Sequence, residues 1–149
     1  MTGLDVEAEV KRQLAEILEK VNKVFRGKKV YEGPEGICFA RDHFYWYDNN
    51  FNPIDPLERI KGSIILSFYN NITSLEGSPR VVGGDFDCSL IRITSFEGGP
   101  EEVGGSFWCN YTRITSLKGC PKKVGGSFNC SNTNITSLEG GPEEVGESF

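Results

Sequence analysis

Residues 124–144 read VGGSFNCSNTNITSLEGGPEE, and residues 103–123 before them read VGGSFWCNYTRITSLKGCPKK. The two segments align without a gap. The tetrapeptide ITSL or ITSF recurs with a constant period of 21 residues, beginning at Ile72, Ile93, Ile114 and Ile135. A fixed period of this length is typical of solenoids, in which each unit is one coil that buries its apolar side only against its neighbours. The sequence therefore predicts a stacked array of about four coils over residues 62–149.

Each unit contains a short strand followed by a turning segment. Phe128 and Cys130 alternate with polar residues, which is the period-two pattern of a strand with one buried face. We expect the equivalent residues of successive coils to form two buried columns, Phe86, Phe107 and Phe128 beside Cys88, Cys109 and Cys130. Paired glycines such as Gly125 and Gly126 precede each strand. They predict either a corner with positive φ or a close approach between the backbones of two coils.

The spacing Phe-x-Cys-x-x-Thr-x-Ile-x-x-Leu, which runs from Phe128 to Leu138, resembles the leucine-rich repeat pattern LxLxxNxLxxL. Thr112 and Thr133 stand where that family usually has asparagine. The consensus sequence of the unit is similar to that of the short leucine-rich-like repeats of many tailed-bacteriophage and bacterial proteins. The resemblance implies a solenoid that serves as a binding scaffold. The phage likeness implies a small accessory protein that binds a host factor and inhibits an anti-phage defence.

The first 61 residues are different in kind. Apolar residues recur there at helical spacing, at Val6, Val10, Leu14, Ile17, Leu18, Val21, Val24 and Phe25. The spacing of Thr2 and Asp5 matches a capping box and Gly27 is a helix stop, so we expect one amphipathic helix over residues 5–26. Short antiparallel strands are expected within residues 29–47, joined by the turns GPEG and RDH.

Solenoids need a cap over the open core of a terminal coil. We therefore interpret residues 1–61 as an N-terminal cap on the solenoid of residues 62–149. The aromatic residues between Phe44 and Phe51 leave open the alternative of an independent binding or effector module. The predicted fold class is α+β, with an N-terminal helix and small β cap followed by a leucine-rich-repeat-like parallel β-solenoid.

Composition and charge exclude several classes of partner. The 149 residues carry a net charge of -5, so the chain lacks the positive field that nucleic-acid binding without sequence preference requires. No stretch approaches the length of an apolar membrane span, and the N-terminal residues lack the pattern of a secretory signal. We expect a soluble cytoplasmic protein, in the host cytoplasm if it is phage-encoded, with neither nucleic acid nor membrane as a direct partner.

Candidate catalytic and metal-binding residues are few. Three of the five cysteines occupy the repeat column, where they are expected to be small buried hydrophobes. His43 is the only histidine, and the sequence contains no CxxC pair. We therefore expect no metal site, no cofactor and no enzymatic activity.

The outward side of the predicted strands is the candidate binding surface. The residues that we expect to contact a partner are Asp85, Asp87, Trp108, Asn110, Tyr111, Arg113 and Asn129. A tryptophan flanked by tyrosine and arginine has the composition of an interaction hot spot. The sequence thus predicts a non-enzymatic module that binds a protein partner. The alternative is a carbohydrate-binding or virion-associated structural protein, because aromatic rings beside Asp and Asn also suit sugars.

The sequence ends at Phe149, within a repeat unit. An uncapped coil would expose apolar core and an unpaired strand edge, which favours contact with another chain. We therefore expect self-association as a homodimer, or docking of a partner, through Ile135, Leu138, Val145 and Phe149. Glu147 replaces the second glycine of the corner, and the alternative is that it blocks further stacking.

Overall fold

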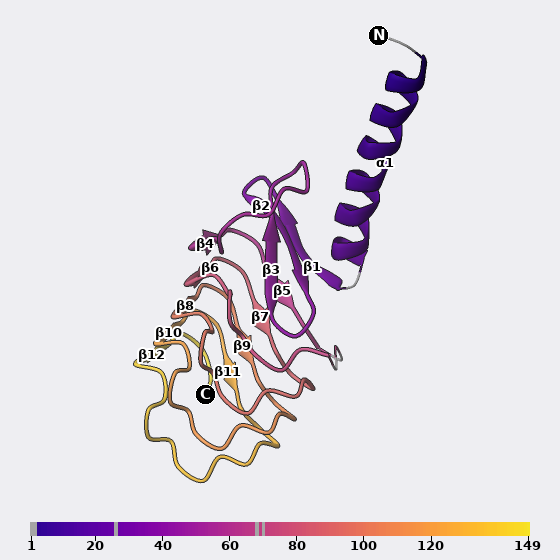
Figure 1. The fold of residues 1–149 in the computed structure, drawn as a ribbon. Coiled ribbons are helices and arrows are strands. Elements are labelled where there is room, and N and C mark those ends of the chain that lie inside the picture. Colours follow the sequence, from indigo (N-terminus) through magenta and orange to yellow (C-terminus); the bar gives the residue numbers. More distant parts are fainter. Residues whose placement is uncertain (1–2, 26, 68, 70) are drawn as a thin grey trace.

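The computed structural model describes residues 3–25, 27–67, 69 and 71–149. Figure 1 shows a long helix, a small antiparallel sheet and a solenoid of stacked coils in chain order. The first elements are α1 (Gly3–Phe25), β1 (Lys28–Gly33), β2 (Gly36–Ala40) and β3 (Phe44–Tyr47). The predicted α+β fold with a parallel β-solenoid of about four turns is therefore confirmed. No helical segment in the described ranges combines the length and hydropathy of a membrane span.

Successive coils contribute two-residue strands to two parallel sheets. The phenylalanine sheet contains β5 (Ile64–Ile65), β7 (Phe86–Asp87), β9 (Phe107–Trp108) and β11 (Phe128–Asn129). The valine sheet contains β4 (Arg59–Ile60), β6 (Val81–Val82), β8 (Glu102–Val103), β10 (Lys123–Val124) and β12 (Glu144–Val145). The sequence pattern predicts the phenylalanine sheet but not the valine sheet. The first strand of the valine sheet begins at Arg59, just before the expected boundary at residue 62.

The two expected columns form the core of the solenoid. Phe86, Phe107 and Phe128 are buried, and successive ring centroids lie 5.5 and 5.2 Å apart. Cys88 and Cys109 are fully buried in the adjoining column, whereas Cys130, which was expected to be buried, is only partly buried in the last coil. Strand pairing aligns each phenylalanine with the next, which confirms the predicted register. Burial of apolar surface contributes roughly 25 cal/mol per Å², so these stacked rings make a large contribution to stability.

The paired glycines permit a close approach between coils. A Cβ atom added at Gly104 would collide with the carbonyl oxygen of Gly83 in the preceding coil. Positive φ occurs instead at the glycine that ends each turning segment, with 82° at Gly98 and 84° at Gly119. Of the two roles that the sequence leaves open, the paired glycines therefore have the close-approach one.

The antiparallel sheet covers the first coil. Phe44 of β3 lies in the same core as Phe86, with ring centroids 6.4 Å apart. The backbone N–H of Phe44 donates to the carbonyl oxygen of Glu76 at 3.1 Å. The indole Nε1 of Trp46 donates to the carbonyl oxygen of Gly77 at 2.7 Å. The expectation of a small β cap is therefore confirmed for β1, β2 and β3.

Glu35, in the turn between β1 and β2, makes a second link between the cap and the first coil. Its Oε1 accepts a hydrogen bond from the Tyr31 hydroxyl at 2.7 Å, and its Oε2 accepts one from the backbone N–H of Lys61 at 3.0 Å. Burial and the bonded carboxylate raise the pKa of Tyr31 to about 12. The same hydroxyl and the Lys61 amide lower the pKa of Glu35. The link is therefore sensitive to pH at both of its titratable groups.

The helix differs from the expectation that all of residues 1–61 form the cap. Figure 1 shows α1 extending away from the sheets. Its residues Val6, Val10, Leu14 and Ile17 are 47% to 59% exposed. Helical periodicity shows that one face is apolar, but it does not show what covers that face. Within the described ranges, the cap is formed by the antiparallel sheet.

Candidate functional site: the outward face of the phenylalanine sheet

The outward residues of the phenylalanine sheet form one column. Parallel pairing places Ile65, Asp87, Trp108 and Asn129 in register across its four strands. Ile65 is exposed and extends the column toward the cap. Sequence reasoning missed Ile65 because the first coil reads GSIILS where the second reads GDFDCS. The available signal was the alignment of residues 62–67 with residues 84–89, which places Ile65 at the position of Asp87.

Two members of the column close the turns of their own coils. Oδ1 of Asp87 accepts hydrogen bonds from the backbone N–H of Ser89 at 2.9 Å and from its hydroxyl at 2.5 Å. Oδ1 of Asn129 accepts the equivalent bonds from Ser131 at 3.0 and 2.7 Å. In the coil between them, Trp108 places a half-buried indole at this position. The middle coil therefore has an aromatic ring where its neighbours have a turn-closing acceptor.

Each of these coils then places one residue in the left-handed backbone region. The φ angle is 61° at Leu90, 58° at Tyr111 and 55° at Asn132. Asparagine tolerates this region, whereas a bulky side chain is uncommon there. The Tyr111 side chain is 57% exposed, so burial in the core does not compensate for the conformation. A strained backbone position is a reason to consider a functional role, and Tyr111 is therefore a candidate contact residue.

A continuous ladder of backbone hydrogen bonds supports this segment. Bonds between coils extend beyond the two-residue strands, from Cys109 N–H to Asn129 O at 2.9 Å and from Tyr111 N–H to Ser131 O at 3.2 Å. Asn110 is half-buried and Arg113 is exposed. The structure thus brings four predicted binding residues together in the segment 108–113, on a backbone that is fixed by its neighbour.

Asp85, another predicted binding residue, lies in a ladder between coils. The hydroxyl oxygen of Ser63 accepts a hydrogen bond from the Asp85 backbone N–H at 2.8 Å. Asp85 Oδ1 accepts one from the Ser106 N–H at 2.8 Å, and the Ser106 hydroxyl accepts one from the Ser127 N–H at 3.0 Å. The carboxylate of Asp85 is thus already engaged in holding adjacent coils in register.

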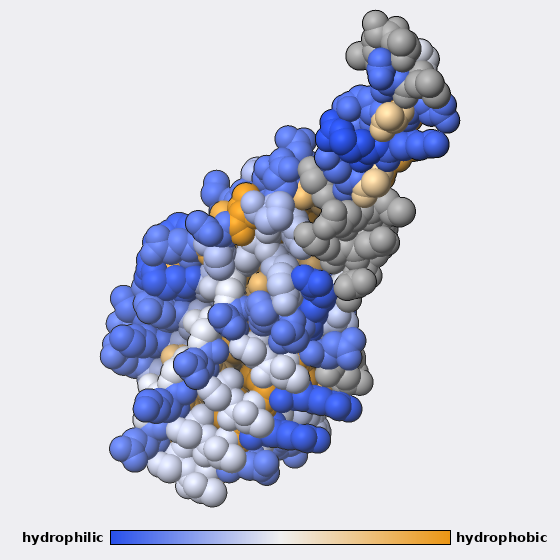
Figure 2. All heavy atoms as spheres, in the orientation of Figure 1, coloured by the Kyte–Doolittle hydropathy of each residue, from blue (hydrophilic) through white to orange (hydrophobic). Residues whose placement is uncertain are grey.

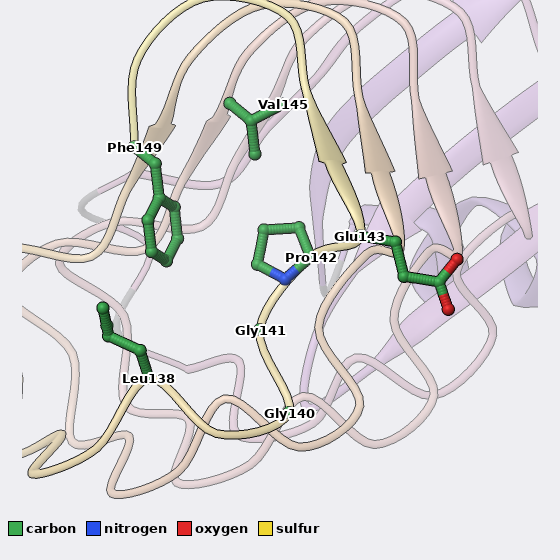
Figure 3. A pocket seen from close by; sticks show the side chains of 7 residues that line it. All are labelled: Leu138, Gly140, Gly141, Pro142, Glu143, Val145 and Phe149. Atoms are coloured by element: carbon green, nitrogen blue, oxygen red, sulfur yellow. The ribbon is translucent and has the colours of Figure 1, made fainter.

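The residues predicted for self-association gather at the end of the last coil. Figure 3 shows Leu138, Val145 and Phe149 around a shallow hollow. Leu138 and Phe149 are exposed, whereas Ile135 and Val145 are partly buried against the core. This end of the solenoid is therefore apolar in the structure, and self-association through it stays a prediction.

The titratable groups do not form a metal centre in the part of the chain that the structure describes. No three His, Cys, Asp or Glu side chains there are placed to hold a metal ion. The cysteine thiols are unpaired, and burial raises the pKa of Cys120 to about 11. His43 stacks on Tyr45, and its Nδ1 lies 3.2 Å from a carboxylate oxygen of Asp42.

No protein-family model matches the chain, and it matches neither a curated protein nor a solved structure. Its class is defined by the fold alone. It is a parallel β-solenoid with an antiparallel β cap, and it presents aromatic side chains on the outward face of one sheet.

Proposed function

We propose that this protein is a non-enzymatic module that binds another protein through the segment 108–113 and the column beside it. The observation that carries the proposal is Tyr111, a mostly exposed aromatic residue in a left-handed backbone conformation. The next coil has Asn132 at the equivalent position, so the fold itself does not require a large ring there. A partner that covers the ring gives this residue a reason to be present.

The composition of the segment fits a protein contact. Tryptophan, tyrosine and arginine are the residues most enriched at interaction hot spots, and Trp108, Tyr111 and Arg113 supply one of each. Tyrosine and tryptophan offer large contact areas with few rotatable bonds, so little conformational entropy is lost when they bind. The fixed backbone beneath them lowers the ordering cost further. Ile65 adds apolar area at the cap end of the column.

One oxygen of each turn-closing residue in the column is already engaged, which reduces the number of polar groups that a carbohydrate could use. A sugar site needs polar groups beside the ring that are available to hydroxyls. Oδ1 of Asp87 and Oδ1 of Asn129 each accept two hydrogen bonds from a serine of their own coil. Carbohydrate binding is therefore kept as an outcome of the test below.

We further propose that the partner is a host protein, in keeping with the resemblance of the repeat to phage proteins. Inhibition of an anti-phage defence factor is the specific version of this proposal. It rests on that resemblance, whereas the binding face rests on the residues of the segment 108–113.

The test is to capture a partner from host lysate and then to measure its affinity for purified variants. Trp108→Ala and Tyr111→Asn should each weaken binding by about 2 kcal/mol, or roughly 30-fold, which is the usual threshold for a hot spot. Glu143→Ala, on an exposed residue outside the segment, should bind as wild type does.

Two results would contradict the proposal. If both variants remain folded and bind the partner as tightly as wild type, the contact lies elsewhere. If a glycan array instead gives binding that is lost in Trp108→Ala, the protein recognises carbohydrate. Circular dichroism of each variant separates loss of contact from loss of fold.

A further inference from the structure

The helix α1 carries an apolar stripe that the described residues leave exposed. Val6, Val10, Leu14 and Ile17 lie along it, each about half exposed. Figure 2 shows hydrophobic surface on the projecting helix between strongly hydrophilic side chains. An isolated helix is only marginally stable in water, and contiguous exposed apolar surface marks an interaction site.

The spacing of the stripe is that of a coiled-coil seam. Val10, Leu14 and Ile17 are four and then three residues apart, and the sequence continues the alternation at Val21 and Val24. In heptad terms Leu14 and Val21 occupy position a, whereas Val10, Ile17 and Val24 occupy position d. A seam of this kind is complementary to a second helix with the same pattern.

Ion pairs lie mostly outside the seam, and Glu7 is the exception, because it precedes Leu14 by seven residues and so occupies position a. Arg12 contacts both Glu9 and Glu16, and Lys11 lies 3.5 Å from Glu7. Surface-lying membrane helices instead carry lysine and arginine on the polar face beside bulky apolar residues. The mixed charges of α1 therefore favour another helix over a lipid surface.

The two ends of the helical region carry opposite charge. Residues 1–10 contain three acidic residues and no basic ones, whereas the last six residues of α1, 20–25, contain two basic residues and no acidic ones. We propose that the α1 helices of two copies of this chain pair with each other in antiparallel orientation. This orientation brings the acidic end of each helix beside the basic end of the other, whereas parallel pairing brings like charges together.

One register aligns the central apolar residues of the two seams. If the numbers of facing residues sum to 31, Leu14 faces Ile17 of the second copy and Val10 faces Val21. The two-fold axis makes this surface complementary to itself, and only Val24 faces a charged residue of the seam, Glu7. The helix dipole also favours this distribution of charge, but it does not explain the apolar stripe.

The first test is sedimentation of the full chain over a range of concentrations. Wild type should form a dimer, and Leu14→Gln with Ile17→Gln should raise the dissociation constant by at least about 100-fold, because four apolar side chains leave the interface. Ala8→Gln with Ala15→Gln, on exposed residues of the same helix outside the seam, is the matched control and should leave the dimer intact. Tryptophan fluorescence checks that the cap and solenoid stay folded in each variant.

The second test addresses orientation. Asp5→Lys with Glu9→Lys, both outside the seam, should weaken the dimer, and the addition of Lys20→Glu with Lys23→Glu should restore it. If the charges act only through the helix dipole, the fourfold variant should instead be the weakest of all, because both helix ends then carry the unfavourable charge.

Several outcomes would overturn the proposal. A wild type that is monomeric at every concentration would do so, as would a dimer that persists in the Leu14 and Ile17 variant or is lost in the Ala8 and Ala15 variant. Binding of wild-type monomer to anionic vesicles would assign the stripe to membranes. Trp108→Ala should not change the dimer, so this proposal and the proposed binding face can fail separately.

Discussion

Tyr111 lies in the left-handed backbone region, which is unfavourable for a bulky side chain such as tyrosine. The equivalent position of the next coil has Asn132 at nearly the same φ, 55° against 58°. Asparagine relieves the steric conflict because its short polar side chain tolerates the left-handed region. Asn132 therefore shows which side chain the backbone prefers at this position, and the tyrosine at 111 is explained by a contact with a partner.

We therefore predict that Tyr111→Asn stabilises the free protein while it weakens partner binding. The free energy of unfolding should rise by about 1 kcal/mol, because the left-handed conformation costs a bulky residue about that much. Urea denaturation of wild type and variant measures the change. The reverse substitution, Asn132→Tyr, is the matched control and should lower stability by a similar amount. A loss of stability in Tyr111→Asn would show that the ring supports the fold.

The residues of the candidate site were predictable only in part. Alternation placed Trp108 and Asn129 on the outward face, and the strand register agrees. The sequence could not show that Asp87 and Asn129 accept hydrogen bonds from their own turns, because composition does not distinguish an available acceptor from an engaged one. The left-handed position was also hidden, since only Asn132 among its three residues has a side chain typical of that region.

Elements with a strong period were predictable, and their packing was not. The helix was expected over residues 5–26 and spans Gly3–Phe25. Its position away from the first coil could not be inferred, because an apolar stripe is the same for a helix that covers a core and for one that awaits a partner. The valine sheet was missed because charged residues and paired glycines flank its valines, so no alternation of apolar and polar residues extends beyond each strand. The valines that recur with the 21-residue period were the only sequence signal for this sheet.

The link between the cap and the first coil should weaken at alkaline pH. The pKa of Tyr31 is raised from 10.0 to about 12 in the folded protein, because the ring is buried and its hydroxyl donates to Glu35. A raised folded pKa contributes stability that is complete below the unfolded pKa and is lost as the pH rises through the folded one. We predict that stability falls between pH 10 and 12 in wild type, beyond the change seen in Tyr31→Phe.

Urea denaturation across this pH window measures the effect, and Glu35→Gln is its control. Glutamine can still accept the hydroxyl bond but carries no charge, so the alkaline loss should be smaller in this variant. At acid pH the sign is opposite. The lowered pKa of Glu35 contributes stability above its ordinary pKa that is lost as the pH falls through the folded value. An identical alkaline loss in wild type and Tyr31→Phe would contradict the assignment.

On the scale of the whole molecule, stability depends on contacts between adjacent coils. Each coil is too small to bury its own apolar side, so a solenoid is stabilised by the interfaces between neighbours. The Phe107 ring lies at the centre of this system, within 5.5 Å of Phe86, 5.7 Å of Phe96 and 5.2 Å of Phe128, measured between ring centroids. It therefore contributes to two interfaces at once.

We predict that Phe107→Ala destabilises the protein by about 3 to 5 kcal/mol, the usual cost of truncating a buried phenylalanine. The cavity would lie between two coils, so both interfaces lose contacts and the loss cannot be confined to one end. Phe149→Ala is the matched control, because Phe149 is 54% exposed and contacts Phe128 alone among the ring pairs of the described residues. Phe149→Ala should lower the free energy of unfolding far less than Phe107→Ala does. Urea midpoints compare the two, and an equal loss would show that the buried column does not govern stability.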